Sequence, residues 1–475
     1  MTTDIACDLC IIGAGSAGLS VAAGAAQLGA RTVLFERGEM GGDCLNTGCV
    51  PSKALLAAAH AASSITQARR FGVTAPEPDI DFGAVMRHVR GVIAAIAPHD
   101  SVARFEGLGV RVIKAQARFT GPKHVIGGGI RVRARRFVIA TGSRAVIPPI
   151  PGIEDIDTLT NETIFSLETR PEHLLVLGGG PVGVEMAQAF RRLGSRVTIF
   201  EAARLLGKDD AEFVDILRRQ LAGEGIAIRE GVNIARIGKA DGGVGVTLGD
   251  AGETVTGSHL LVAAGRRPGI DGLDLARAGV EATAKGIIVD ARLRTSNRRI
   301  YALGDVAGGP QFTHVAGYQA GIVIRNALFR IPARVKYRAL PWVTYTSPEL
   351  AHVGMTGAEA QKRFGARLQV TRADFTGNDR AQAERDTVGG IKVLTQPNGT
   401  ILGVSILGAH AGELSHVWAL AIARGLKLSA LTGTMFPYPT LGEINARAAS
   451  AFYAPRLFSA WPRRLVRLLT RSWLP

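Results

Sequence analysis

One glycine-rich pattern occurs twice in the chain, and each copy lies between an apolar strand-like run and a helix-like run. The first copy occupies residues 13–18 (GAGSAG) and the second occupies residues 178–183 (GGGPVG). After each helix, a second apolar strand ends in an acid, Glu36 and Glu201 respectively. This arrangement is typical of a βαβ unit that binds a dinucleotide. Two copies therefore predict two dinucleotides.

Each glycine of the first copy has its own physical role. Gly13 makes the tight turn, and Gly15 lets the backbone approach a pyrophosphate. Gly18 allows the helix to pack closely on the strand, and Glu36 accepts a hydrogen bond from a ribose hydroxyl. An acid in the position of Glu201 favours NADH, although a nearby cation, Arg204, leaves NADPH open.

Four residues separate Cys44 from Cys49, and glycines lie close to both cysteines. A helix-like stretch from Lys53 to Ala62 follows. Such a pair can close a small disulfide ring. The dipole and free amides of a helix N-terminus favour a thiolate, so we expect a lowered pKa for Cys49. A disulfide does not readily take a hydride, and a flavin is the natural carrier between nicotinamide and sulfur. The alternative is a structural disulfide or two buried thiols.

The cysteine run resembles the redox-active disulfide motif of the class I pyridine nucleotide–disulfide oxidoreductases, which include dihydrolipoamide dehydrogenase, glutathione reductase and mercuric reductase. Three further segments resemble family motifs in the family's order: residues 137–142 (FVIATG), 260–268 (LLVAAGRRP) and 300–305 (IYALGD). One departure is Gly269, where the family usually has Asn. The resemblance implies an α/β chain with two Rossmann-like dinucleotide-binding domains, for FAD and NAD(P), and a C-terminal α+β dimerisation domain.

The resemblance also implies domain limits. We expect FAD-binding residues in 1–150 and 273–339, an NAD(P)-binding domain in 151–272, a dimerisation domain in 340–460 and a basic tail in 461–475. The dimerisation domain implies a homodimer in which each C-terminal domain completes the active site of the partner.

By the same resemblance, individual residues acquire roles. Cys49, nearer the flavin, becomes the charge-transfer thiolate, and Cys44 becomes the interchange thiol exposed to substrate. Lys53 and Glu185 match an ion pair beside the flavin N5. The residues expected to bind FAD are Gly13, Gly15, Gly18, Glu36, Lys53, Thr141, Gly142, Asp305 and Ala316. Those expected to bind NAD(P) are Gly178, Gly180, Val182, Gly183, Glu201 and Gly265.

The chain departs from the family's disulfide reductases near its C-terminus. Their motif His-Pro-Thr-x-x-Glu supplies the acid–base for the interchange thiol, but here Tyr438 holds the His position and Glu443 remains. A tyrosine with its ordinary pKa near ~10 is a poor base at neutral pH. Mercuric reductases resemble this chain in having Tyr here, which favours them over the alternative, dihydrolipoamide dehydrogenase. They also carry a C-terminal cysteine pair that delivers Hg(II), and this chain has no cysteine after Cys49.

No pattern predicts a resident metal. Cys7 and Cys10 form a CxxC in the first apolar strand, where residues three apart should face opposite sides, so we expect two packed small hydrophobes. His314, His410 and His416 show no ligand spacing with the cysteines.

The composition limits partners and compartment. The net charge is +16, but the basic residues form no nucleic-acid motif, so we expect no nucleic-acid binding. Four cysteines are too few for a disulfide-stapled secreted scaffold, which favours the cytoplasm. Residues 9–26 are apolar but follow acids rather than a basic segment, so we expect neither a signal peptide nor a membrane span.

The tail has an amphipathic pattern. Residues 461–473 contain four Arg and no acid. Arg464, Arg467 and Arg471 share one helical face, whereas Leu465, Leu468 and Leu469 lie mainly on another. The pattern predicts either an interfacial helix on anionic lipid at the inner membrane surface or a helix packed on the dimer body. The first possibility implies a membrane-surface electron-relay protein, an alternative of a different class.

Overall fold

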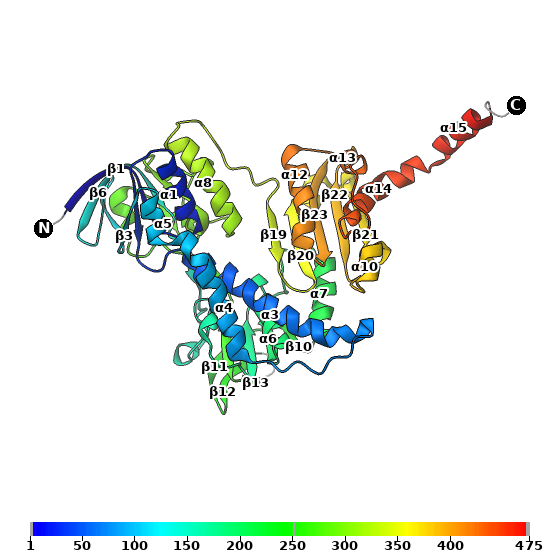
Figure 1. Cartoon of the computed structure of the whole chain (residues 1–475), viewed down its shortest axis with the longest axis horizontal. Helices are drawn as coiled ribbons and strands as arrows, with labels where there is room; N and C mark the ends of the chain where they lie inside the picture. Colours follow the sequence, from blue (N-terminus) through cyan, green and yellow to red (C-terminus); the bar gives the residue numbers. More distant parts are fainter. Residues whose placement is uncertain (1–2, 250–251, 472–475) are drawn as a thin grey trace. The chain divides into compact units, whose positions relative to one another are not determined.

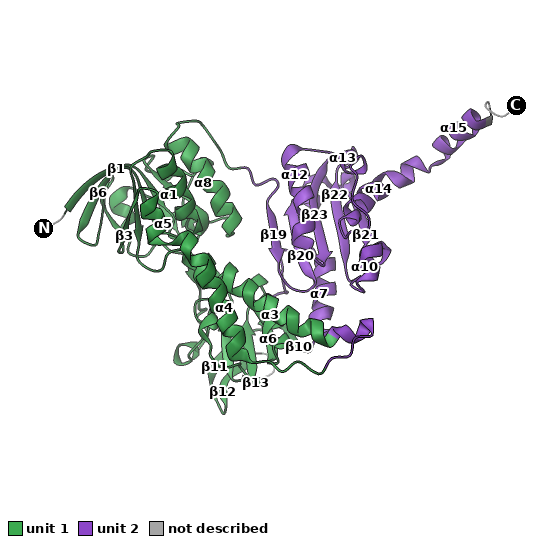
Figure 2. Ribbon diagram, in the orientation of Figure 1, with its two compact units in different colours: residues 1–66, 76–202, 226–335 green, residues 67–75, 203–225, 336–475 purple. Residues whose placement is uncertain are grey.

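The computed structural model describes residues 3–249 and 252–471, and contacts divide the chain into two compact units (Figures 1 and 2). The first unit contains residues 1–66, 76–202 and 226–335, and the second contains residues 67–75, 203–225 and 336–475. Each unit has its own sheets and apolar core.

The first unit is built around a seven-stranded sheet in the order β3-β2-β1-β6-β5-β4, with β18 also pairing with β6. Its strands are β1 (Thr3–Ile12), β2 (Thr32–Glu36), β3 (Val110–Lys114), β4 (Arg118–Gly121), β5 (His124–Gly127), β6 (Ile130–Ile139) and β18 (Ile300–Ala302). β1, β2, β3, β6 and β18 run parallel. Their apolar residues are buried because helices α1 (Ser16–Gln27) and α8 (Thr313–Ala327) share a core cluster with this sheet.

A second parallel sheet in this unit has the order β10-β9-β8-β14. Its strands are β8 (His173–Leu177), β9 (Arg196–Glu201), β10 (Ile226–Glu230) and β14 (His259–Val262), and helix α6 (Pro181–Arg192) contacts β8 and β9. A three-stranded antiparallel sheet contains β11 (Ile234–Ala240), β12 (Gly243–Leu248) and β13 (Thr254–Gly257). Two further antiparallel pairs are β7 (Ser143–Ala145) with β15 (Arg266–Pro268), and β16 (Ala282–Thr283) with β17 (Gly286–Ile287). The remaining helices of the unit are α2 (Gly42–Asn46), α3 (Cys49–Gln67), α4 (Phe82–Ile96) and α5 (Val102–Gly107).

The second unit contains a five-stranded antiparallel sheet in the order β19-β20-β23-β22-β21. Its strands are β19 (Pro341–Thr344), β20 (Glu349–Gly354), β21 (Gln369–Asp374), β22 (Gly390–Thr395) and β23 (Ile401–Gly408). Its helices are α7 (Ala211–Gly223), α9 (Gly357–Phe364), α10 (Asp379–Ala383), α11 (Ala411–Leu414), α12 (His416–Arg424), α13 (Leu428–Thr432), α14 (Glu443–Leu457) and α15 (Ala460–Arg471). Trp418 of α12 is fully buried in this core, and its indole N–H donates to Asn445 Oδ1 at 2.7 Å.

Two structural details differ from expectation. The sequence predicts one helix from Glu413 to Arg424, but the structure has two, α11 and α12, separated at Ser415. Residues 203–225, expected within the segment 151–272, group with the second unit. The predicted domain limits remain predictions.

The expected placement of Cys7 and Cys10 on opposite sides of the first strand was wrong. Both side chains are buried in the same apolar cluster. The amides of Asp8 and Leu9 both donate to the carbonyl of Arg31, so the strand is irregular between the two cysteines and the alternation is interrupted. Burial raises the pKa of both thiols, to about 12 for Cys7, which makes them small apolar core residues.

Candidate functional site

A cavity of about 590 Å³ lies where β1, β2 and β6 end. Ligands of open parallel sheets bind at this edge, outside the carboxyl ends of the strands. Five of the residues expected to bind FAD line this cavity: Gly13, Gly15, Glu36, Thr141 and Gly142.

Close backbone contacts require glycine at two positions of the first turn. Gly13 has φ +104°, and a Cβ there would lie 2.4 Å from the carbonyl oxygen of Ala140. A Cβ at Gly18 would lie 1.8 Å from the carbonyl oxygen of Gly13. The Glu36 carboxylate accepts the Ala14 N–H at 2.6 Å, so this acid also holds the turn. A side chain at either glycine would therefore displace the turn.

The residues around the cavity fit FAD. Thr141 Oγ1 is buried and has no hydrogen-bond partner among the described residues, which makes it an available donor or acceptor for a ligand. Asp305, which follows β18, accepts a hydrogen bond from Ser143 Oγ at 2.5 Å, and burial raises the pKa of this carboxyl. Ala316 is buried in the first turn of α8, which begins at Thr313.

The second glycine turn repeats this geometry at the end of β8. Gly178 has φ +113°, and a Cβ at Gly183 would lie 2.0 Å from the carbonyl oxygen of Gly178. A Cβ added at Gly180 would meet no atom within 4 Å, so this glycine keeps its surface open for a ligand. The Glu201 carboxylate accepts the Gly179 N–H at 2.7 Å, as Glu36 accepts an amide in the first turn.

Two further residues are predicted to bind NAD(P). One belongs to the second glycine pattern, and the other lies in residues 260–268. Val182, in the first turn of α6, is 42% exposed. Gly265 follows β14 and has a positive φ of +129°. Their contact with a nucleotide stays a prediction.

Cys44 lies in α2, and Cys49 begins α3; both are free thiols. A hydrogen bond with Cys44 lowers the pKa of Cys49 to about 6, assisted by Thr313 and by the positive charge of Lys53. The same hydrogen bond, together with burial, raises the pKa of Cys44. The Cys49 sulfur lies 3.4 Å from Thr313 Oγ1, so the N-termini of α3 and α8 both meet at this thiol. The reduced pair therefore holds one proton, on Cys44.

The assignment of Cys49 as the charge-transfer thiolate rests on the pKa difference between the two thiols. The role of Cys44 as the interchange thiol stays a prediction.

Lys53 and Glu185 are brought together from distant parts of the sequence. Lys53 Nζ on α3 lies 2.7 Å from Glu185 Oε2 on α6. The Glu185 side chain is only 6% exposed, compared with 38% for Lys53. A carboxylate this deeply buried requires a compensating charge, which the lysine supplies.

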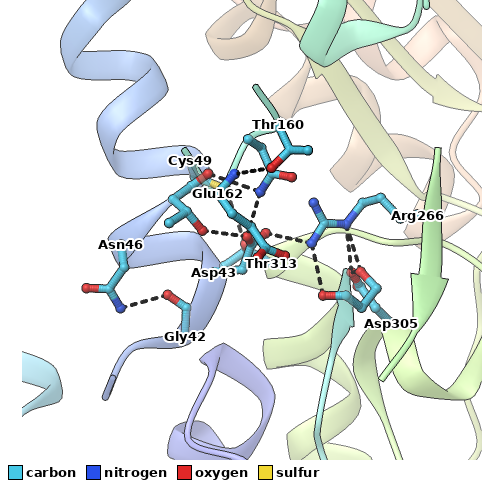
Figure 3. Close-up of polar contacts among 12 residues, drawn as sticks. Gly42, Asp43, Asn46, Cys49, Thr160, Glu162, Arg266, Asp305 and Thr313 are labelled. Carbon is cyan, nitrogen blue, oxygen red and sulfur yellow. Dashed lines mark hydrogen bonds and ion pairs between the residues drawn. The ribbon is translucent and has the colours of Figure 1, made fainter. Parts of the chain in front are cut away.

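A polar network beside the cysteines was not predicted (Figure 3). Asp43 accepts hydrogen bonds from Arg266 Nη2 at 2.9 Å and from Asn161 Nδ2 at 2.8 Å. Arg266 also lies 3.9 Å from Asp305, so it links the cysteine helix to the aspartate expected to bind FAD. Asp43 and Arg266 lie inside recognised motifs, but neither motif indicates that they pair.

Tyr438 and Glu443 belong to the second unit. Tyr438 is 70% exposed, and its hydroxyl donates to Asp379 Oδ2 at 3.1 Å. This hydrogen bond raises the pKa of Tyr438. The Glu443 carboxylate accepts a long hydrogen bond from the Thr440 N–H at 3.4 Å. Asp379, which sequence reasoning missed, is thus the carboxylate that orients the phenol.

Residues 3–249 and 252–471 lack two kinds of feature. They contain no group of three or more His, Cys, Asp or Glu side chains arranged to hold a metal ion. Within the same residues, no helix combines the length and apolar character needed to cross a membrane.

Comparisons with known proteins extend over nearly the whole chain. Residues 7–320 match the family model described as pyridine nucleotide-disulphide oxidoreductase, and residues 340–449 match the dimerisation domain of that description. A mercuric reductase from Streptomyces lividans is 38% identical over 455 residues, which cover 94% of this chain and 96% of that protein. A dihydrolipoyl dehydrogenase from Thermus scotoductus is 37% identical over 462 residues, covering 94% and 97%.

A solved structure is similarly close in fold. The Cu(II) complex of the HOCl-induced flavoprotein disulfide reductase RclA from Escherichia coli has a TM-score of 0.84 and 29% sequence identity, covering 93% of this chain and 99% of that one.

Proposed function

Because the chain belongs to the pyridine nucleotide-disulphide oxidoreductase family, we propose that its Cys44–Cys49 pair delivers electrons from NAD(P)H to a soft metal ion. The protein is an FAD-dependent oxidoreductase. FAD, when bound, supplies the two-electron relay between the nucleotide and the disulfide. The observation that carries the choice of acceptor is Tyr438, in the position where the family's disulfide reductases have a histidine.

Thiol–disulfide exchange with an external disulfide requires a thiolate on the attacking cysteine. The raised pKa of Cys44 keeps this thiol protonated at neutral pH. Tyr438 is a poor acceptor of that proton at neutral pH, because its hydrogen bond to Asp379 raises its pKa further and keeps the phenol protonated. The chain therefore lacks the features that make lipoamide or glutathione disulfide good acceptors.

Binding of a soft metal ion requires different chemistry of the two cysteines than thiol–disulfide exchange does. Thiolate sulfur is a preferred ligand of soft cations, and metal binding displaces the thiol proton without a separate base. Cys49 offers a thiolate at neutral pH, and Cys44 would release its proton to solvent when the ion binds. The two electrons of one NAD(P)H reduce one Hg(II) to the metal, or two Cu(II) to Cu(I). Hg(II) and Cu(II) are the candidate ions because one relative is a mercuric reductase and one similar structure is a Cu(II) complex.

Dihydrolipoyl dehydrogenase is the second candidate. The two kinds of relative are 38% and 37% identical, so overall identity does not separate them. Tyr438 counts against dithiol chemistry and thus favours a mercuric-reductase-like function.

The decisive experiment follows NADH oxidation by the purified flavoprotein in parallel with Hg(II), Cu(II), lipoamide, oxidised glutathione and a quinone. We expect turnover with a metal ion and poor turnover with lipoamide. Tyr438→His should increase lipoamide turnover at least several-fold because it supplies a base near neutral pH. Tyr438→Phe is the matched control and should leave lipoamide turnover low. Fast lipoamide turnover by the unaltered protein would refute the proposal.

We propose NADH rather than NADPH as the donor. Glu201 lies at the end of β9, where an acid suits a free ribose 2′-hydroxyl. Arg204, the cation that left NADPH open, pairs with Asp215 at 2.9 Å and donates to the Ala211 carbonyl. We expect the unaltered protein to have a lower KM for NADH than for NADPH, and we expect Glu201→Ala to remove or reverse this difference. A lower KM for NADPH in the unaltered protein would contradict the choice.

The assembly and compartment complete the proposal. The match to a dimerisation domain supports a homodimer. We place the enzyme in the cytoplasm, where a reducing environment keeps an exposed thiol such as Cys49 available.

A further inference from the structure

The last helix, α15 (Ala460–Arg471), follows α14 at the C-terminal end of the chain (Figure 1). All residues from Pro455 to Thr470 are exposed, except for the half-buried Pro462. The segment therefore has a regular backbone without the buried side chains that normally support a helix in a folded protein.

One side of α15 is apolar. Trp461, Leu465, Leu468 and Leu469 follow the spacing i, i+4, i+7, i+8, which places them on one helical face. Their exposed fractions are 71%, 40%, 68% and 56%. Leu457 and Phe458, exposed at 60% and 62%, precede this stripe. A continuous exposed apolar stripe of this kind indicates a binding surface.

The opposite side of α15 is basic. Arg463, Arg464 and Arg467 are exposed, and at 100° per residue they fall outside the apolar arc. No acidic residue follows Glu443 in the sequence. A partner that accepts apolar side chains and carries negative charge at its surface would match both sides of this helix.

A protein partner explains these features less well than a lipid surface. The match to the dimerisation domain ends at residue 449, before α15 begins, so the matched region does not include this helix. An apolar protein groove would bury the leucines and leave the arginines in water, without using their charge. The surface of an anionic bilayer supplies both requirements at once.

We propose that α15 lies in the interface of an anionic lipid bilayer and docks the enzyme on the membrane. Its leucines enter the acyl boundary, Trp461 lies at the level of the headgroups, and the arginines contact lipid phosphates. The net charge of +16 adds long-range attraction to the same surface. A single short helix gives reversible rather than permanent attachment. This docking is independent of the proposed electron acceptor.

The test is flotation of the full-length flavoprotein with vesicles of phosphatidylcholine alone or mixed with phosphatidylglycerol. We expect flotation with the mixed vesicles, little with phosphatidylcholine alone, and a decrease with added salt. Leu468→Asp should abolish flotation. The matched control Thr470→Asp adds the same charge on the polar side and should retain most of it. Each of Arg463→Gln, Arg464→Gln and Arg467→Gln should weaken partitioning by about fivefold.

The remaining outcomes would overturn the proposal. Equal flotation of Leu468→Asp and the unaltered protein would show that the stripe does not enter lipid. Dissociation of the homodimer by Leu468→Asp, measured by sedimentation without vesicles, would show that a second copy of the chain covers the stripe. NADH oxidation in solution should be unchanged in all these variants, so a failure of docking and a failure of the proposed function can be distinguished.

Discussion

Cys44 and Cys49 are chemically different although only four residues separate them. Their shared hydrogen bond lowers the pKa of one thiol and raises that of the other. Thr313 and Lys53 add to the asymmetry on the Cys49 side. The reduced pair therefore offers one thiolate at neutral pH, which suits a soft ligand better than an exchange reaction that needs a second base.

The pKa of Cys49 can be measured by alkylation. In the reduced protein, iodoacetamide should modify Cys49 slowly below pH 6 and faster as the pH rises through about 6, because only the thiolate reacts. Cys44→Ala should raise the pH at which the rate increases, since it removes the stabilising hydrogen bond. Cys7→Ala, which changes a buried thiol of the core cluster, is the control. A midpoint near the ordinary thiol pKa in the unaltered protein would contradict this view.

The Lys53–Glu185 pair gives a stability prediction. Lys53→Met leaves the buried Glu185 carboxylate without this lysine and should lower the free energy of unfolding by about 1–3 kcal/mol. Lys53→Met/Glu185→Gln removes the charge as well and should recover part of that loss. Urea denaturation of the apoprotein measures both changes. A double variant less stable than Lys53→Met would show that the carboxylate is stabilised mainly by other groups.

Residues inside local motifs were predictable, and residues paired across the fold were not. The glycine identities have backbone reasons within each turn: Gly13 and Gly178 have positive φ, and a Cβ at Gly18 or Gly183 would meet the carbonyl oxygen of the first glycine of its own turn. The Asp43–Arg266–Asn161 network depends on three segments meeting in space. The irregularity that turns Cys7 and Cys10 to the same cluster arises from one carbonyl of a neighbouring strand, which the alternation within a single strand cannot indicate.

The second glycine turn is the element whose role is easiest to isolate. Gly180→Ala should not affect folding, because a Cβ there meets no protein atom within 4 Å. It should weaken NADH binding about 10-fold or more if the dinucleotide approaches this backbone as the motif implies. FAD content and melting temperature should stay unchanged.

Gly91→Ala is the control for this prediction, since Gly91 lies in α4 and its added Cβ also meets no protein atom. This variant should bind NADH normally. Unchanged NADH affinity in Gly180→Ala would show that the second fingerprint does not bind the nucleotide.

Elements with a strong hydrophobic period were predicted close to their observed limits. The apolar runs predict strands at residues 174–177 and 196–200, and β8 and β9 each extend one residue further. The helix predicted at residues 316–329 is α8, which begins three residues earlier. Breaks such as Ser415 between α11 and α12 were missed, because apolar residues continue on both sides of the break.

At the scale of the whole chain, a dinucleotide-binding region and a dimerisation domain are joined in one polypeptide, as the family matches show. The glycine fingerprints predicted the dinucleotide-binding region because each carries its own strand and helix signals, and the resemblance to the family implied the dimerisation domain. The sequence left two possibilities open for the tail, since the amphipathic pattern fits both a lipid surface and a packed helix. Exposure along α15 leaves an apolar stripe uncovered in this chain, and the basic side of the helix is the reason for proposing lipid as its partner.

Electron transfer to a reversible bond between Cys44 and Cys49 is the central step of the proposed function. The most direct measurement treats the anaerobic oxidised flavoprotein with NADH, adds iodoacetamide and maps the modified cysteines by mass spectrometry. We predict that NADH makes Cys44 and Cys49 newly available for modification, whereas Cys7 and Cys10 stay unmodified in the folded protein. Identical labelling with and without NADH, or a purified protein that takes up no flavin, would contradict the account.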